Sequence, residues 1–343
     1  WPVLLTAGIE AGLTEEEVGD CLKAARTLAT DKSLPVTMFP WAERLPKPTE
    51  WLIGGVIPRE SCIVIGAEEK TGKTWVSLLM SLVLASEGRL LDTWQAKKRG
   101  RSLLISPEGS RSGLQRRLYG LCWSLRLDPA KVAPWVQIWP GRLSLADDKQ
   151  VADLRTTIRV LKPDLLGIDP LVTATDAESE NDAAAMQAAL NKIRDLLPLN
   201  PGMSAVVCHH LAKGSADRSP WHALRGSSAL GAWADGLVTL RRAGESASAV
   251  RRIDTWHRDD PSPEPKGFRL VTGASEVPGV PTIRLEPCAA PEIGGRGAKK
   301  TGDQLLTDVR KDPGKWTISA WARWRQVSDF AAKAALNPIL GVL

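Results

Sequence analysis

Short apolar runs alternate with helical patterns through most of the chain. Six runs predict buried strands: Cys62–Gly66, Ser102–Ser106, Val136–Trp139, Leu165–Asp169, Ala205–Cys208 and Gly236–Leu240. The intervening segments predict helices at Lys73–Glu87, Gly113–Leu125, Lys149–Leu161 and Asp182–Leu197. Strands that alternate with helices indicate an α/β domain with a largely parallel sheet. Two later runs, Phe268–Val271 and Thr282–Leu285, predict antiparallel additions to this sheet.

The flanks differ from the α/β region, which we place at residues 51–290. Thr14 and Glu17 form a capping-box pattern, so residues 1–32 predict a helical segment. Residues 33–50 are proline-rich and residues 291–302 are glycine-rich, and both are interpreted as linkers. Residues 303–343 hold two short amphipathic stretches. Because the chain begins with Trp1 and not Met, we expect it to be a fragment of a longer protein.

The amino-acid composition excludes several classes of protein. Hydrophobic residues make up 43% and charged residues 24%, which excludes a disordered or fibrous chain. No run of 18 apolar residues and no signal peptide is present, so we expect a cytoplasmic protein without a membrane partner. The five cysteines are scattered without zinc-ligand spacing. The net charge of +6 is compatible with a polyanionic partner but does not require one.

The segment 67–74, Ala-Glu-Glu-Lys-Thr-Gly-Lys-Thr, matches the P-loop pattern, with Ala in place of the first Gly. It follows a predicted strand and opens a predicted helix, which is the context that the motif requires. Backbone N–H groups of such a turn bind phosphate, Lys73 adds a mobile charge, and the Thr74 hydroxyl can ligate Mg²⁺. The expected nucleotide-binding residues are Gly66, Ala67, Glu68, Glu69, Lys70, Thr71, Gly72, Lys73, Thr74 and Trp75.

Two acidic residues follow predicted strands. Asp169 ends an apolar run, and an acid at the carboxyl end of a parallel strand faces the ligand crevice. We therefore expect Asp169 to hold Mg²⁺, as a Walker B acid does. Because Pro170 and not Glu follows it, the residue that activates water must come from elsewhere. Glu108, just beyond another strand, suits a general base or a water-positioning group.

A further strand ends in His209 and His210, and either side chain could contact the γ-phosphate and report its loss. The following residues, 211–228, lack apolar periodicity and are polar. They hold three basic residues that could track a nucleic-acid backbone: Lys213, Arg218 and Arg225.

Together these motifs resemble the RecA-like ATPases of the RepA-type hexameric replicative helicase family, a group of AAA-family ATPases of plasmids and phages. The resemblance covers roughly residues 51–285 and includes Ser106-Pro-Glu108 and the 225–230 motif Arg-Gly-Ser-Ser-Ala-Leu. It implies a RecA-like P-loop NTPase fold and a hexameric ring with ATP between subunits and single-stranded DNA in the channel. By position, it assigns Lys73 and Thr74 to phosphate and Mg²⁺, Asp169 to Walker B, Glu108 to catalysis, and His210 or His209 to the sensor.

The resemblance does not assign a residue of this sequence to the arginine finger. Asp235 stands where we look for it, so Arg241 and Arg242 are the substitutes. Residues 4–30 look like the tail of a primase-polymerase domain, and residues 303–337 look similar to part of a winged-helix module.

The leading hypothesis is a DNA helicase or translocase that hydrolyses ATP. One alternative is a RecA-like DNA-dependent ATPase that acts as a recombinase or helicase loader without unwinding. Another is a replisome adaptor that binds nucleotide without motor activity.

Overall fold

The structure is a computed structural model that describes residues 9, 12–30, 48–107, 110–139, 141–175, 182–212, 220–224, 229–244 and 249–292. The chain divides into two units, Trp1–Pro48 and Thr49–Leu343. In the first unit, helix α2 (Glu15–Thr30) begins with the predicted capping box, in which Thr14 Oγ1 accepts from the Glu17 backbone N–H at 3.2 Å. The predicted partial winged-helix segment, 303–343, lies outside the described residues.

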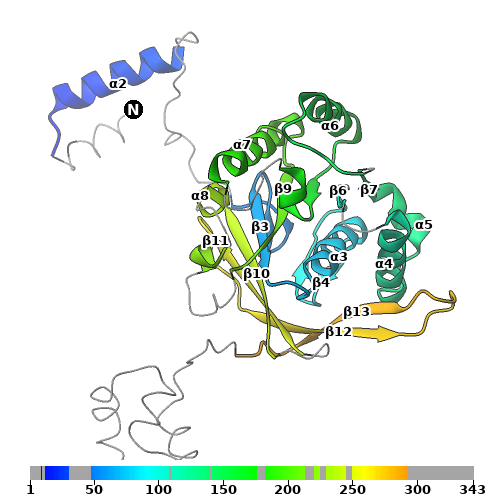
Figure 1. The fold of residues 1–343 in the computed structure, drawn as a ribbon. Helices are drawn as coiled ribbons and strands as arrows, with labels where there is room; N and C mark the ends of the chain where they lie inside the picture. The colour runs from blue at the N-terminus through cyan, green and yellow to red at the C-terminus, as the bar shows by residue number, and fades with distance from the viewer. Residues whose placement is uncertain are drawn as a thin grey trace, which may run out of the picture. The chain divides into compact units, whose positions relative to one another are not determined.

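Within the described residues, the second unit is built on a nine-stranded sheet in the order β13-β12-β11-β10-β3-β9-β8-β6-β7 (Figure 1). The parallel strands are β3 (Cys62–Ala67), β6 (Ser102–Ile105), β7 (Val136–Ile138), β8 (Leu165–Ile168), β9 (Ser204–His210) and β10 (Gly236–Arg242). The antiparallel strands are β11 (Arg251–His257), β12 (Lys266–Gly273) and β13 (Thr282–Cys288). The predicted α/β fold class is confirmed, whereas β11 was not predicted.

Two short antiparallel pairs lie outside this sheet. They are β1 (Trp51–Ile53) with β2 (Ile57–Pro58), and β4 (Arg89–Leu90) with β5 (Trp94–Gln95). We did not predict them, because runs of two or three residues are too short to show a periodic pattern.

Helices cover both faces of the sheet (Figure 1). The first group is α3 (Lys73–Ser86), α4 (Arg111–Ser124) and α5 (Pro129–Val132), and the second is α6 (Asp148–Leu161), α7 (Ala183–Arg194) and α8 (Ala229–Trp233). Short 3₁₀ turns are η1 (Ala133–Trp135), η2 (Leu171–Ala174), η3 (Leu197–Leu199) and η5 (Pro220–Ala223). The predicted Asp182–Leu197 helix is shorter at both ends, and Asp182 caps it by accepting from the Ala185 N–H at 3.0 Å.

Alternation of side chains along the central strands produces two separate cores. On β3, Ile63 and Ile65 pack into the core that contains α3 and α4, whereas Cys62 and Val64 pack into the core that contains α6 and α7. A strand buried on both faces shows a continuous apolar run, which is why period-2 alternation is hidden in its sequence. The same alternation decides which residues at the strand ends face α3.

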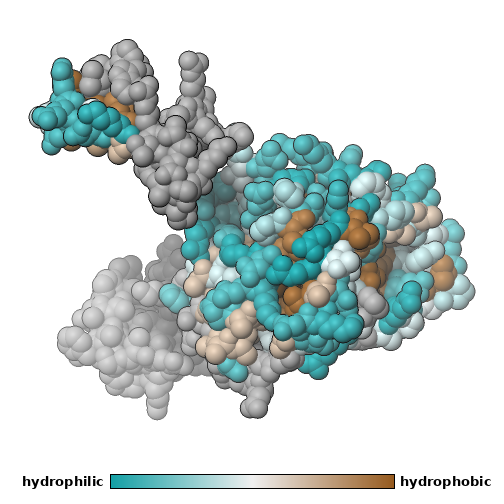
Figure 2. All heavy atoms as spheres, turned by 90° about the horizontal axis from the view of Figure 1, so that it is seen from above, coloured by the Kyte–Doolittle hydropathy of each residue, from teal (hydrophilic) through white to brown (hydrophobic). Residues whose placement is uncertain are grey.

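One face of the second unit is largely polar. In Figure 2, hydrophilic residues cover most of the visible face of its described part, and hydrophobic residues gather in small groups. No helix among the described residues has the length and apolar character needed to cross a bilayer.

Helix α4 lies unusually close to the loop before β13. A Cβ atom placed on Gly120 would be 2.5 Å from the backbone carbonyl oxygen of Pro281. Backbone cannot move aside as a flexible side chain can, so only glycine allows this approach.

We therefore expect Gly120→Ala to lower the free energy of unfolding by about 2 kcal/mol, because the added methyl overpacks the α4–β13 contact. Denaturant unfolding of the full chain measures the change. Gly19→Ala in α2 is the matched control, since no described atom lies within 4 Å of its added Cβ. Equal stability of the Gly120 and Gly19 variants would contradict the close contact.

Candidate nucleotide site

The P-loop connects the end of β3 to the start of α3. Ala67 is the last residue of β3, so the position needs no glycine and tolerates a methyl group. The turn is made by Lys70 (φ 58°) and Gly72 (φ 112°), and the latter conformation strongly favours glycine. Gly72 precedes α3 without a side-chain cap, so the first N–H groups of the helix are available to an anion.

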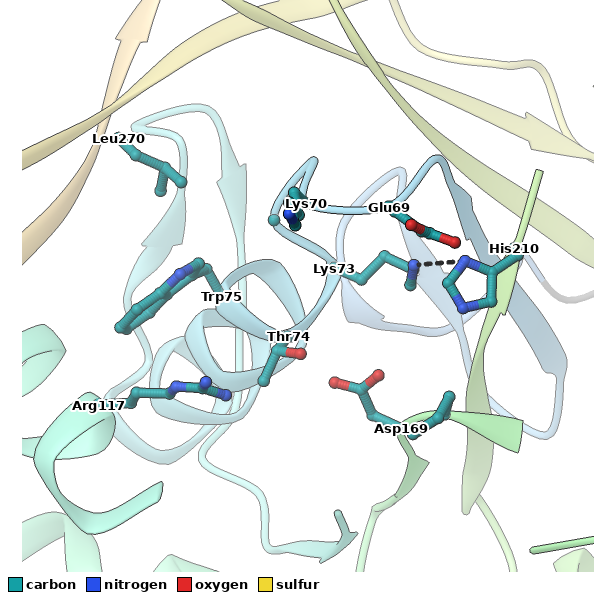
Figure 3. A pocket seen from close by; sticks show the side chains of 11 residues that line it. Glu69, Lys70, Lys73, Thr74, Trp75, Arg117, Asp169, His210 and Leu270 are labelled. Carbon is teal, nitrogen blue, oxygen red and sulfur yellow. Dashed lines mark hydrogen bonds between the residues drawn. The ribbon is translucent and has the colours of Figure 1, made fainter. Parts of the chain in front are cut away.

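Lys73 and His210 lie in contact at the centre of the site (Figure 3). The distance from Lys73 Nζ to His210 Nδ1 is 3.2 Å, and Lys73 Nζ is also 3.5 Å from the Ala67 carbonyl oxygen. An ammonium group can only donate a hydrogen bond, so Lys73 Nζ is the donor in this contact and His210 Nδ1 the acceptor. His210 is thus a direct partner of the lysine that the P-loop pattern assigns to phosphate.

Strand alternation separates the two histidines. Cys208, two residues before His210, packs into the core on the α3 side of β9, and His210 lines the pocket on that side. His209 points to the other face and is 1% exposed. Of the two sensor candidates, the structure therefore brings only His210 to the P-loop.

Asp169 follows β8 and lies between the P-loop helix and Cys208. Burial raises the pKa of its carboxyl, while hydrogen bonds from Thr74 and Cys208 and the charges of Lys73 and Arg117 act in the opposite direction. Burial also raises the pKa of the Cys208 thiol, which therefore stays a protonated donor.

One carboxylate oxygen of this acid, Asp169 Oδ2, is buried without a hydrogen-bond partner. Asp169 lines the same pocket as Thr74. A carboxylate beside a hydroxyl is the oxygen-donor set that Mg²⁺ prefers, and the orphaned oxygen is the atom that a cation would satisfy. The residues therefore fit a Mg²⁺ ion bound together with phosphate.

The cavity around these groups has a volume of about 590 Å³. Its lining includes two residues from distant elements that the sequence did not single out: Arg117 of α4 and Leu270 of β12. Trp75, expected here as a neighbour of the P-loop, lies between them in Figure 3. Glu69 and Lys70 also line the cavity.

Arg251 of β11 supports the P-loop from outside the pocket. Its side chain is buried, Nε donates to the Thr71 carbonyl oxygen at 3.0 Å, and Nη1 donates to the Ala249 carbonyl oxygen at 2.7 Å. Burial and the nearby charge of Arg242 lower the pKa of Arg251. A buried arginine is retained only where its donors are satisfied, so this contact joins β11 to the phosphate loop.

The remaining predicted residues are not at this pocket in the described part of the chain. Arg241 and Arg242 end β10, opposite Arg252 and Arg251, and do not line the cavity. Asp235 lies near the start of β3, where it accepts from the Cys62 N–H at 2.8 Å and pairs with Arg194. Four predicted residues lie outside the described residues: Glu108, Lys213, Arg218 and Arg225.

A family model described as AAA domain (AAA_25) matches residues 25–216, which is more than half of the chain. The chain belongs to this AAA-domain family. Family membership and the P-loop site support a P-loop ATPase that binds nucleotide. No curated protein matches the sequence significantly.

Solved structures of related shape include two proteins of low sequence identity to this AAA-domain chain. The RadB recombinase is 15% identical with a TM-score of 0.46, and the match covers 62% of this chain and 88% of that one. The KaiC-like protein PH0186 from Pyrococcus horikoshii OT3 is 13% identical with a TM-score of 0.46, and the match covers 70% of this chain and 100% of that one.

Asp169→Asn should stabilise the nucleotide-free AAA domain at pH 7 by on the order of 1 kcal/mol while abolishing Mg²⁺-dependent turnover. The raised pKa means that folding opposes ionisation of this carboxyl, so the ionised form costs stability at neutral pH. The difference in unfolding free energy between the variant and the native chain should shrink as the pH falls toward about 4, where an ordinary aspartate protonates. Thermal unfolding across pH measures it. A variant less stable than the native chain at pH 7 would contradict the buried charge.

Arg251→Gln should weaken nucleotide binding roughly tenfold, because a charged hydrogen bond that shapes the loop is lost. Calorimetric titration with ATP and Mg²⁺ measures the dissociation constant. Arg252→Gln is the control on the same strand, since Arg252 pairs with Asp254 instead of the P-loop. Both variants lose stability, but only the Arg251 variant should lose affinity. Equal affinity in the two would show that the Thr71 contact does not position the loop.

Proposed function

We propose that this chain is an ATP-hydrolysing DNA helicase or translocase of plasmid or phage replication that acts as a hexameric ring on single-stranded DNA. The observation that carries the proposal is the direct connection from Lys73, through His210, to the base of the predicted DNA-binding loop. Such a connection would let the occupancy of the phosphate site change the position of groups that hold DNA.

The base of that loop rests on the P-loop strand. The Leu211 N–H donates to the Ala67 carbonyl oxygen at 3.1 Å, and Leu211 pairs with Leu224 in an antiparallel bridge. The Ala212 N–H donates to the Ala223 carbonyl oxygen at 2.8 Å. Leu211, Ala212, Ala223 and Leu224 therefore anchor both ends of the predicted loop beside β3. In the sequence, the residues between these anchors include Lys213 and Arg218, whose charges suit a DNA backbone.

Lys73 and His210 provide the chemical link. The phosphate oxygens of ATP would compete with His210 for the Lys73 ammonium, because a hydrogen bond from an ammonium group to an anionic oxygen is stronger than one to an imidazole nitrogen. Binding and loss of the γ-phosphate would then change the contact at the end of β9. This competition gives His210 the sensor role.

Hydrolysis itself would follow in-line attack of water on the γ-phosphate. The P-loop N–H groups and Lys73 bind the phosphates, and Glu108 orients the water. Thr74 and Asp169 would hold Mg²⁺, which when bound neutralises charge on the phosphates. Arg241 or Arg242 of a neighbouring subunit would complete the site. The remaining contribution of the protein would be the positioning of these groups around the phosphates.

Lys73→Ala should reduce DNA-stimulated ATP hydrolysis by roughly 10²-fold or more and abolish separation of a forked duplex, because the charge that neutralises the phosphates is lost. Phosphate release and strand separation are measured on the same preparation. Lys98→Ala, an exposed lysine outside the pocket, is the matched control.

Measurements of ATP binding, ATP hydrolysis and fork separation on the native chain distinguish the three hypotheses. Hydrolysis that single-stranded DNA stimulates, without fork separation, would favour the recombinase or loader. Nucleotide binding without turnover would favour the adaptor. No affinity for ATP with Mg²⁺ would overturn all three.

A further inference from the structure

Arg117 is a positively charged group of the nucleotide pocket that no motif assigns. It comes from α4, whereas the recognised phosphate-binding groups come from the P-loop and α3. It lines the same cavity as Lys73, Thr74 and Asp169. In Figure 3 its guanidinium group extends toward Thr74, on the side of the pocket where Asp169 also points.

The position of Arg117 is held by an aromatic ring. Its Cζ atom is 5.6 Å from the centroid of the Trp75 ring, a cation–π distance. Trp75 directly follows Thr74 on α3, so the stack ties the guanidinium to the helix that begins at the phosphate loop. The close approach of Gly120 to Pro281 holds α4 itself in place. The guanidinium is therefore placed before nucleotide binds.

The donors of Arg117 remain available for a ligand. Its side chain is exposed to solvent, and within the described part of the chain it forms no ion pair with a carboxylate. It is nevertheless close enough to Asp169 for its charge to lower the pKa of that carboxyl. An arginine that lines a pocket and keeps its planar set of donors free is suited to bind phosphate oxygens in pairs.

The charged residues that line the pocket indicate what Arg117 contributes to it. Lys70 and Lys73 are offset by Glu69 and Asp169, so Arg117 supplies the net positive charge among the charged residues that line it. Most of the negative charge that ATP adds over ADP is on the γ-phosphate. That phosphate is expected beside Thr74 and Asp169, because these residues would hold a Mg²⁺ ion bound together with the phosphates.

We propose that Arg117 is a ligand of the γ-phosphate supplied by the same subunit, and that Trp75 holds it in position. This inference rests on the proposed function, since it assumes that the pocket hydrolyses ATP. Arg117 would stabilise the charge that develops on the γ-phosphate, in addition to any arginine from a neighbouring subunit. It would also let the site distinguish ATP from ADP.

The test compares Arg117→Gln with Arg116→Gln, a neighbouring exposed arginine that does not line the pocket. Calorimetric titration gives the affinities for the slowly hydrolysed analogue ATPγS and for ADP, each with Mg²⁺. We expect Arg117→Gln to lose about tenfold or more in ATPγS affinity while ADP affinity changes less than about twofold. ATP turnover should fall by roughly 10²-fold. Arg116→Gln should match the native chain in all three measurements.

Two further variants examine the geometry. Arg117→Lys keeps the charge but loses the paired donors, so it should restore only part of the ATPγS affinity. Trp75→Leu should reduce ATPγS affinity more than ADP affinity, because the guanidinium loses its support. Equal losses for ATPγS and ADP in Arg117→Gln would overturn the proposal, since they would place Arg117 at a part of the nucleotide that both share.

The outcomes also separate this proposal from the proposed function. If the native chain hydrolyses ATP and Arg117→Gln behaves like it, only the role of Arg117 fails. If the native chain and Arg116→Gln both lack affinity for ATPγS, the nucleotide site itself fails and the role of Arg117 fails with it. Thermal unfolding of every variant shows whether a lost affinity reflects a lost fold.

Discussion

Alternation of side chains along buried parallel strands is the constraint on which the site depends. Successive residues point to opposite faces, so a group beyond a strand end reaches α3 only if its position has the right parity. His210 and Asp169 meet this condition and lie beside the P-loop helix, whereas His209 does not. A one-residue shift of β9 would exchange the two histidines. The chemistry therefore depends on the register of β9 with β3, which pairs Ala67 with His210.

The second constraint is the free energy needed to bury the charged groups that the site brings together. Asp169 is buried with one oxygen unpartnered, and its raised pKa shows that folding alone does not favour the ionised form. The nearby positive charges of Lys73 and Arg117 only partly offset this cost. A cation bound together with phosphate would offset the rest of the free-energy cost of the ionised Asp169 carboxylate. The ionised Asp169 carboxylate thus lowers the stability of the nucleotide-free domain, which is common where function and stability compete.

Much of this arrangement could be predicted from local patterns, and the part that could not has a physical reason. The P-loop, the six parallel strands and the position of Asp169 each follow from residues close together in the sequence. Strand β11 was missed because its sequence, Arg-Arg-Ile-Asp-Thr-Trp-His, shows no continuous apolar run. Arg117 and Arg251 were missed for another reason. Each gains its role from a contact with a distant segment, and the local sequence does not distinguish such an arginine from any other arginine on a helix or a strand. Glu108 stays a prediction.

The antiparallel strands β11–β13 contact both of these distant parts of the site. Arg251 of β11 binds the Thr71 carbonyl oxygen, and Leu270 of β12 lines the pocket next to Gly72. The loop before β13 in turn contacts α4 at Gly120, three residues beyond Arg117. The same three strands therefore contact both the loop that holds phosphate and the helix that carries the additional arginine. Because packed elements transmit displacements instead of absorbing them, a shift of these strands would move both groups together.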